Sequence, residues 1–259
     1  MALYEMHIWD HVMAIIICVF APIMAFTARK ISTEEIKLLP QDKIRLYHSN
    51  GLLLIVFGLI VITTWRLPGR TLAELGLDWP VWNSYVILFL LVVGLFYFFD
   101  IFFQYGSRRW RERTYRERHK VFSFVPADAN EMVHFTFLAF AAGIGEEIIF
   151  RGYLIHYITY WTDTSFIGIM VACFFSSALF AFLHGYQGVK SMFKIFFLAL
   201  MFCGIFVYSQ SLWLVIIVHA LIDVFSGLIG IYLIKELGSI EHRAESKEPI
   251  DGLGNKKGE

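Results

Sequence analysis

The sequence predicts an all-α protein: a polytopic membrane bundle of about seven transmembrane helices with an added interfacial helix. Hydrophobic residues make up 58% of the 259 residues and charged residues only 17%, well below a soluble domain. Apolar runs long enough to cross a bilayer recur along the chain. Helices are expected because lipid offers no hydrogen-bond partners to an unpaired backbone.

The apolar runs give the expected spans in order, and the fourth is longer than a bilayer requires. The expected spans are residues 8–26, 48–65, 83–104, 132–160, 166–184, 190–208 and 211–234. The first run lacks a basic leading segment and a small-residue cleavage site, so we expect a retained span rather than a signal peptide. The three cysteines are scattered through apolar runs and predict neither a disulfide framework nor a thiolate metal site.

Two connecting segments have a character of their own. Residues 71–80 predict a short helical turn at the outer surface, ended by Gly76 and Pro80. Residues 108–120 mix arginines with Trp110 and Tyr115. Next to a membrane span, this mixture predicts a cytoplasmic interfacial helix against anionic headgroups rather than a nucleic-acid site.

Lysine and arginine predict the orientation of the spans. Nineteen of them fall in the segments on one side of the bundle, including the C-terminal tail, against two in the segments on the other side. We therefore expect an integral membrane protein with its N-terminus outside and its C-terminus in the cytoplasm. The expected location is a prokaryotic cytoplasmic membrane.

Three charged side chains interrupt the fourth apolar run, where burial in lipid is costly. Glu147 and Arg151 are four residues apart with the acid first, so they share a helix face and should pair. Glu146 points about 100° away from Glu147 and has no obvious partner in its own helix. A structural role between helices explains the pair, whereas Glu146 is free to take up and return a proton.

Two further spans carry polar groups. His184 closes span five, with Phe180 one turn earlier, and His219 and Asp223 lie four residues apart on one face of span seven. Because lipid excludes such groups, we expect the three helices to turn them toward one cavity. His184 lies at the end of its expected span and His219 deeper within its own, so a shared cavity requires span five to dip or to continue past Gly185.

The polar residues of these three spans include acids and imidazoles but no obvious serine or cysteine nucleophile. The serines near them are the small residues expected where two helices pack closely. Acids and imidazoles can activate a water and polarise a carbonyl, or hold a zinc ion that does both. Hydrolysis of an amide fits either route. The competing hypotheses are a proton-coupled transporter, and a non-catalytic immunity or scaffold protein in the membrane.

Three motifs, in this order, resemble those of a known family. EEIIFR at 146–151 is similar to the family's EExxxR, FAFLH at 180–184 to FxxxH, and HALID at 219–223 to HxxxN/D. Together they resemble the CAAX-processing and bacteriocin-processing protease family, also called CPBP or Abi. The expected parts are N-terminal helices and a basic segment at 1–130, a CPBP-like catalytic core at 131–235, and a polar cytoplasmic tail at 236–259 without stable structure.

The resemblance implies an intramembrane endopeptidase. By the family pattern, Glu146 would activate the water with help from His184, while His219 and Asp223 would line the oxyanion side. The residues implied to order the site are Glu147, Arg151 and Phe180. The family's prenyl-protein endopeptidases carry Asn where this chain has Asp223, and an ionised Asp cannot donate to an oxyanion. Orienting His219 is therefore the expected role of Asp223.

The expected partners are the lipid bilayer and a membrane-associated protein or peptide substrate, with no nucleic acid. We expect no cofactor, since the sequence has no HExxH spacing. The alternative is a zinc-dependent version of the same protease, whose candidate ligands are Glu146, His184, His219 and Asp223.

Overall fold

The computed structural model describes residues 5–31, 38–114 and 124–245. Within these ranges seven helices are long and apolar enough to span a membrane, which confirms the predicted helical bundle. These spans are Ile8–Thr27, Pro40–Arg66, Ser84–Tyr105, Ala129–Thr162, Phe166–Leu183, Val189–Ser209 and Leu212–Glu236. Each overlaps the corresponding expected span.

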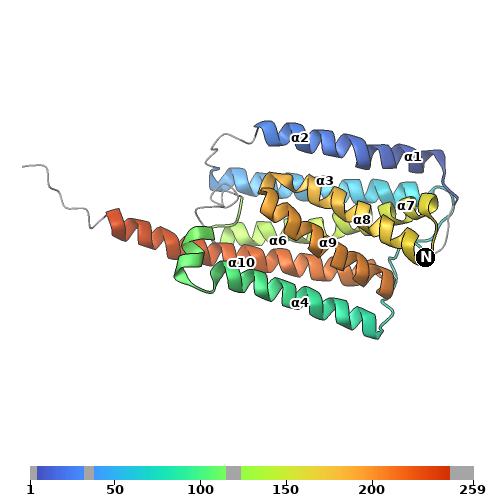
Figure 1. The fold of residues 1–259 in the computed structure, drawn as a ribbon. Helices are drawn as coiled ribbons and strands as arrows, with labels where there is room; N and C mark the ends of the chain where they lie inside the picture. Colours follow the sequence, from blue (N-terminus) through green and yellow to red (C-terminus); the bar gives the residue numbers. More distant parts are fainter. Residues whose placement is uncertain (1–4, 32–37, 115–123, 246–259) are drawn as a thin grey trace, which may run out of the picture.

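The elements follow the chain in an up-and-down order (Figure 1). They are α1 (Ile8–Ile15), the π-helix η1 (Ile16–Phe20), α2 (Ala21–Ile31), α3 (Pro40–Arg66), α4 (Ser84–Tyr105), α6 (Ala129–Glu147), the π-helix η2 (Ile148–Leu154), α7 (Ile155–Thr162), α8 (Phe166–Leu183), the 3-10 turn η3 (Gly185–Gln187), α9 (Val189–Ser209) and α10 (Leu212–Glu245). The long fourth span is therefore one continuous rod, α6–η2–α7, which packs against α3 and α10.

The starts of α6 and α8 coincide with polar caps in the sequence. The Asp128 carboxylate accepts from the Glu131 amide at the start of α6, and the Ser165 hydroxyl accepts from the Gly168 amide at the start of α8. Such caps satisfy backbone N–H groups that have no partner inside the helix. These two caps place the starts of α6 and α8 at polar boundaries.

The hairpin of α8 and α9 is short compared with its neighbours. Helix α8 has 18 residues, whereas the α6–η2–α7 rod has 34. At 1.5 Å per residue, α8 is about 24 Å shorter than the rod. In Figure 1 the turn that joins α8 to α9 is accordingly set inward from the left-hand ends of α3 and α10. The residues of this turn thus lie inside the bundle's length.

Two segments bear on the sequence expectation. The expected short turn at residues 71–80 is a hydrogen-bonded turn at residues 72–76, which ends at Gly76, where φ is +99° and the N–H bonds to the Ala73 carbonyl. In the same turn, Leu75 is fully buried in the core. Helix α10 continues to Glu245, so the expected unstructured tail is wrong for residues 236–245; Glu, Arg and Ala favour helix there. Residues 246–259 lie outside the described ranges.

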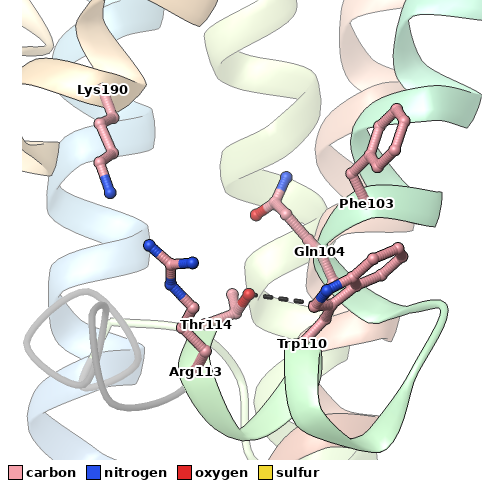
Figure 2. A pocket seen from close by; sticks show the side chains of 6 residues that line it. All are labelled: Phe103, Gln104, Trp110, Arg113, Thr114 and Lys190. Atoms are coloured by element: carbon pink, nitrogen blue, oxygen red, sulfur yellow. Dashed lines mark hydrogen bonds between the residues drawn. The ribbon is translucent and has the colours of Figure 1, made fainter.

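The interfacial segment is described in part. Residues 108–114 are helical, and Trp110 and Thr114 line a pocket beside the end of α4 (Figure 2). The rest of the expected interfacial helix, residues 115–120, lies outside the described residues.

Candidate active site

Two glycines allow the fourth span to approach its neighbours at the turn that carries the charged residues. A Cβ on Gly145 would lie 2.6 Å from the backbone oxygen of Leu54 on α3. A Cβ on Gly143 would lie 3.0 Å from the backbone oxygen of Ile216 on α10. Both distances are too short for any larger residue without a backbone shift. The close approach to α10 brings Glu147 within reach of His219.

The predicted ion pair forms at the centre of the bundle. Arg151 Nη1 lies 2.9 Å from Glu147 Oε1, and both side chains are fully buried. The guanidinium also lies over the rings of Phe180, at 4.6 Å, and Phe202, at 5.5 Å. An aromatic face attracts a cation, so the rings offset part of the cost of burying Arg151.

A π-helix, η2, begins directly after Glu147 and contains Arg151. Its wider turns leave backbone groups in need of partners, and the Ser176 hydroxyl donates to the Phe150 carbonyl at 2.8 Å. Ser176 is thus a structural contact between α8 and η2. Short π-helical segments occur often at functional sites.

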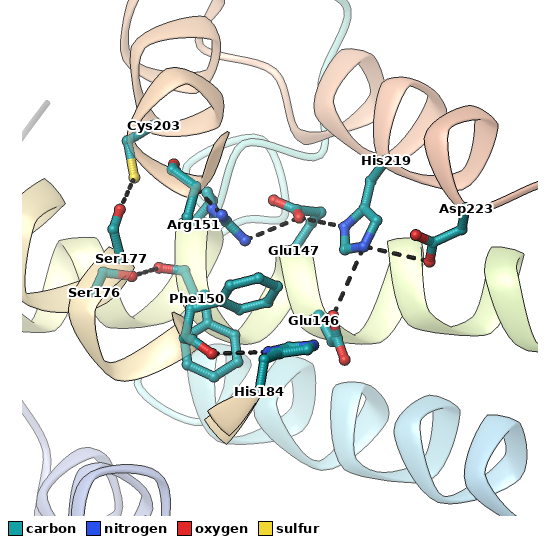
Figure 3. Close-up of polar contacts among 12 residues, drawn as sticks. Glu146, Glu147, Phe150, Arg151, Ser176, Ser177, His184, Cys203, His219 and Asp223 are labelled. Carbon is teal, nitrogen blue, oxygen red and sulfur yellow. Dashed lines mark hydrogen bonds and ion pairs between the residues drawn. The ribbon is translucent and has the colours of Figure 1, made fainter. Parts of the chain in front are cut away.

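His219 joins α10 to the charged turn (Figure 3). Its Nδ1 lies 2.6 Å from Glu147 Oε1. Its Nε2 lies 3.8 Å from Glu146 Oε2 and 3.6 Å from Asp223 Oδ2. Sequence spacing could suggest the Asp223 neighbour, but it could not reveal the direct partner, Glu147, because that contact joins positions 72 residues apart.

The adjacent glutamates lie in different environments. The Glu147 side chain is fully buried against Arg151 and His219, while that of Glu146 is 15% exposed and that of Asp223 is 35% exposed. Among the described ion pairs, Glu146 has only His219 as a cationic neighbour, at the longer distance. Glu146 is consequently the carboxylate of the turn that is open to a water.

His184 caps the C-terminal end of α8, where its Nδ1 lies 2.8 Å from the Phe180 carbonyl oxygen. A carbonyl only accepts, so Nδ1 carries the hydrogen and Nε2 of a neutral ring is an acceptor. The Phe180 ring lies 4.5 Å from the His184 ring and 6.2 Å from the His219 ring. The short α8–α9 hairpin therefore places both histidines around one phenylalanine, and Figure 3 shows the Glu146 carboxylate directed toward them.

Sequence reasoning did not single out Tyr186, whose ring stacks 6.2 Å from that of His184. The Tyr186 ring is more than half exposed, but neighbouring helices desolvate its hydroxyl and raise its pKa. The negative charges of Glu146 and Asp223 raise that pKa further. The phenol thus keeps its proton at neutral pH and can donate. Its position two residues after His184 is the signal that could have identified it.

The candidate zinc ligands do not assemble into a metal-binding set. In the described part of the chain, no three His, Cys, Asp or Glu side chains are grouped so that they could hold a metal ion. The Nδ1 atoms of His184 and His219 bond to the Phe180 carbonyl and to Glu147, so only their Nε2 atoms face the site. The arrangement suits proton transfer between closely spaced acids and imidazoles.

Comparison with known proteins agrees with the motifs. Residues 128–225 match the family model described as "Type II CAAX prenyl endopeptidase Rce1-like". This region contains all three motifs, so the predicted resemblance to the CPBP proteases is confirmed. No curated protein and no solved structure matches the chain.

Proposed function

From the Rce1-like match over residues 128–225, we propose that the chain is an intramembrane endopeptidase acting on a membrane-associated substrate. A water activated by Glu146 and His184 hydrolyses the peptide bond. The observation that carries this proposal is the difference in burial and pairing between Glu146 and Glu147. Glu147 is fully buried and paired with Arg151, whereas Glu146 is partly exposed beside the two histidines.

The attacking water gives up a proton as its oxygen bonds to the scissile carbonyl carbon. Glu146 accepts that proton, and the unprotonated Nε2 of His184 accepts a hydrogen bond from the same water. The C–N bond then breaks, and the proton held by Glu146 passes to the leaving amine. The carbonyl re-forms as the C–N bond breaks, and the products, a carboxylic acid and an amine, ionise in water to a carboxylate and an ammonium ion, with the enzyme restored.

His219 stabilises the negative charge on the carbonyl oxygen. Its Nδ1–H donates to Glu147, whose own charge is balanced by Arg151. A ring protonated on both nitrogens directs its Nε2–H between Glu146 and Asp223, where the oxyanion forms. The negative charge of Asp223 favours the protonated His219 ring, and its carboxylate oxygen fixes the direction of the ring. Orienting the ring needs only a hydrogen-bond acceptor, so either Asp or Asn can do it.

We also propose the orientation with the N-terminus outside. The support is the excess of lysine and arginine in the segments at the other end of the bundle. The α8–α9 turn, with His184 and Tyr186, faces that basic end, so a substrate enters from the cytoplasmic side. Labelling of single cysteines placed at residues 79 and 235 in intact cells tests this: only the first should react with an impermeant reagent.

The proposed activity is tested by profiling protein termini in membranes of cells that carry the wild type or Glu146→Gln. We expect new termini with the wild type that disappear with Glu146→Gln. Asp100→Asn is the matched control, because Asp100 is also an intramembrane carboxylate but pairs with Lys194 outside the site. Identical termini in wild type and Glu146→Gln, at equal protein levels, would refute the proposal.

A further inference from the structure

A pair of histidines joins α3 to α6 outside the candidate active site. His48 Nε2 on α3 lies 2.9 Å from His134 Nδ1 on α6, and the two ring centroids are 5.0 Å apart. His48 is exposed and His134 is half-buried, so water reaches the pair. His134 lies about 18 Å before Glu146 along α6, at 1.5 Å per residue. The pair therefore takes no part in the proposed hydrolysis.

The packing of α3 against α6 places the two rings. The His48 ring stacks on the Phe137 ring of α6 at 5.2 Å, with 26° between the planes. Gly51, one turn after His48, makes room for Phe137, since a Cβ there would lie 2.6 Å from the phenylalanine ring. Phe137 is itself one turn after His134 on α6. Contacts between the helices, as well as the hydrogen bond, thus bring the two imidazoles together.

The basic residues on the preceding turns of α3 are paired with acids. Lys43 Nζ lies 3.1 Å from Glu131 Oε2 on α6, and Arg45 Nη1 lies 3.8 Å from Asp42 Oδ1. A paired cation repels a second cation less than an unpaired one does, because the acid cancels most of its field. These charges therefore allow a positive ion to bind at the histidines.

Two imidazoles at this separation have nearly the geometry of a metal chelate. Zinc binds imidazole nitrogen at about 2.0–2.1 Å, so tetrahedral coordination separates two such nitrogens by about 3.3 Å. The observed 2.9 Å needs an opening of only about 0.4 Å. The hydrogen between the facing nitrogens then moves to the far nitrogen of its own ring, so each ring binds as a neutral imidazole.

From this geometry we propose that His48 and His134 bind a zinc ion that links α3 to α6. Water completes the coordination of the ion on the exposed side of the pair. The two ligands come together only when the helices are packed, so zinc stabilises the folded bundle. This zinc is structural, and it differs from the zinc-dependent alternative for the protease, whose ligands would lie around Glu146. The proposal does not rest on the proposed function.

The test is calorimetric titration of zinc chloride into the purified full-length protein in neutral detergent, without a polyhistidine tag. The test variants are His48→Gln and His134→Gln. The matched control is His11→Gln, because His11 is also half-buried and bonds through Nδ1, to the Tyr157 hydroxyl at 3.0 Å. We expect one zinc per chain in the wild type and the control. Either test variant should bind zinc about 100-fold more weakly, since a second ligand on the same chain raises affinity by about 10²–10⁴-fold.

Melting temperatures in EDTA and in zinc give a second readout. Zinc should raise the melting temperature of the wild type and of His11→Gln but not of either test variant. The test variants lie on different helices, so a folding defect in one of them leaves the other to decide. Equal zinc affinity in all four proteins, or no saturable binding by the wild type, would overturn the proposal. Loss of zinc binding in Glu146→Gln would also overturn it, because the ion would then belong to the candidate active site.

Discussion

Replacing Arg151 with methionine tests the structural role of the Glu147–Arg151 pair. Arg151→Met keeps an unbranched side chain of similar length but leaves the fully buried Glu147 carboxylate without its cation. Removing one member of a buried pair costs about 3–5 kcal/mol. His219 Nδ1 remains 2.6 Å from Glu147 Oε1 and can balance part of the charge when protonated. We therefore expect a loss at the low end, about 3 kcal/mol of unfolding free energy.

The assay is reversible unfolding in bicelles or mixed micelles, monitored by tryptophan fluorescence. The double variant Glu147→Gln/Arg151→Met removes both charges, so it should recover at least about 1 kcal/mol relative to Arg151→Met alone. A cost below about 1 kcal/mol for the single change would refute the reasoning. So would a double variant whose cost equals the sum of the two single changes, because such additivity means no coupling.

Three further predictions concern the site and its packing. Tyr186→Phe should fold normally and lower kcat about threefold to tenfold, the value of one hydrogen bond, and an unchanged rate would remove the phenol from the site. A strong zinc chelator should leave cleavage unaffected, whereas inactivation that only zinc reverses would establish the metal-dependent alternative. Gly145→Ala should destabilise the fold by about 1–3 kcal/mol, because its Cβ would meet the Leu54 backbone. Gly94→Ala is the control and should not destabilise the fold, because the space around its Cβ is open. Equal melting temperatures for the two variants would show that α3 and α6 are less tightly packed.

The helical bundle and one ion pair could be predicted because both follow from local rules. Apolar run length indicates a span, and the spacing of Glu147 and Arg151 indicates a shared face, whatever the rest of the chain does. The contact of His219 with Glu147 depends on how α10 packs against α6. Helical periodicity predicts on which side of its own helix a residue lies, but it does not predict which other helix packs against that side.

The depth of His184 in the bundle could not be predicted from the sequence either. Because α8 has 18 residues, its end could be placed at the membrane surface or inside the bundle, and only the packing of the α8–α9 hairpin decides this. The short turn at residues 71–80 could be predicted together with its end at Gly76, whereas the burial of Leu75 in the core could not. Helix α10 continues to Glu245 through Gly238 and Ser239, and Glu, Arg and Ala beyond them favour helix.

The most direct test of the account is the cleavage rate of purified Glu146→Gln, measured beside its melting temperature on a membrane-proximal peptide that the wild type cuts. Loss of a general base lowers the rate by about 10²–10⁴-fold. We predict a loss in that range with a melting temperature equal to that of the wild type, since Glu146 lies outside the buried pair. A wild-type rate in folded Glu146→Gln would contradict the central claim that this glutamate activates the water.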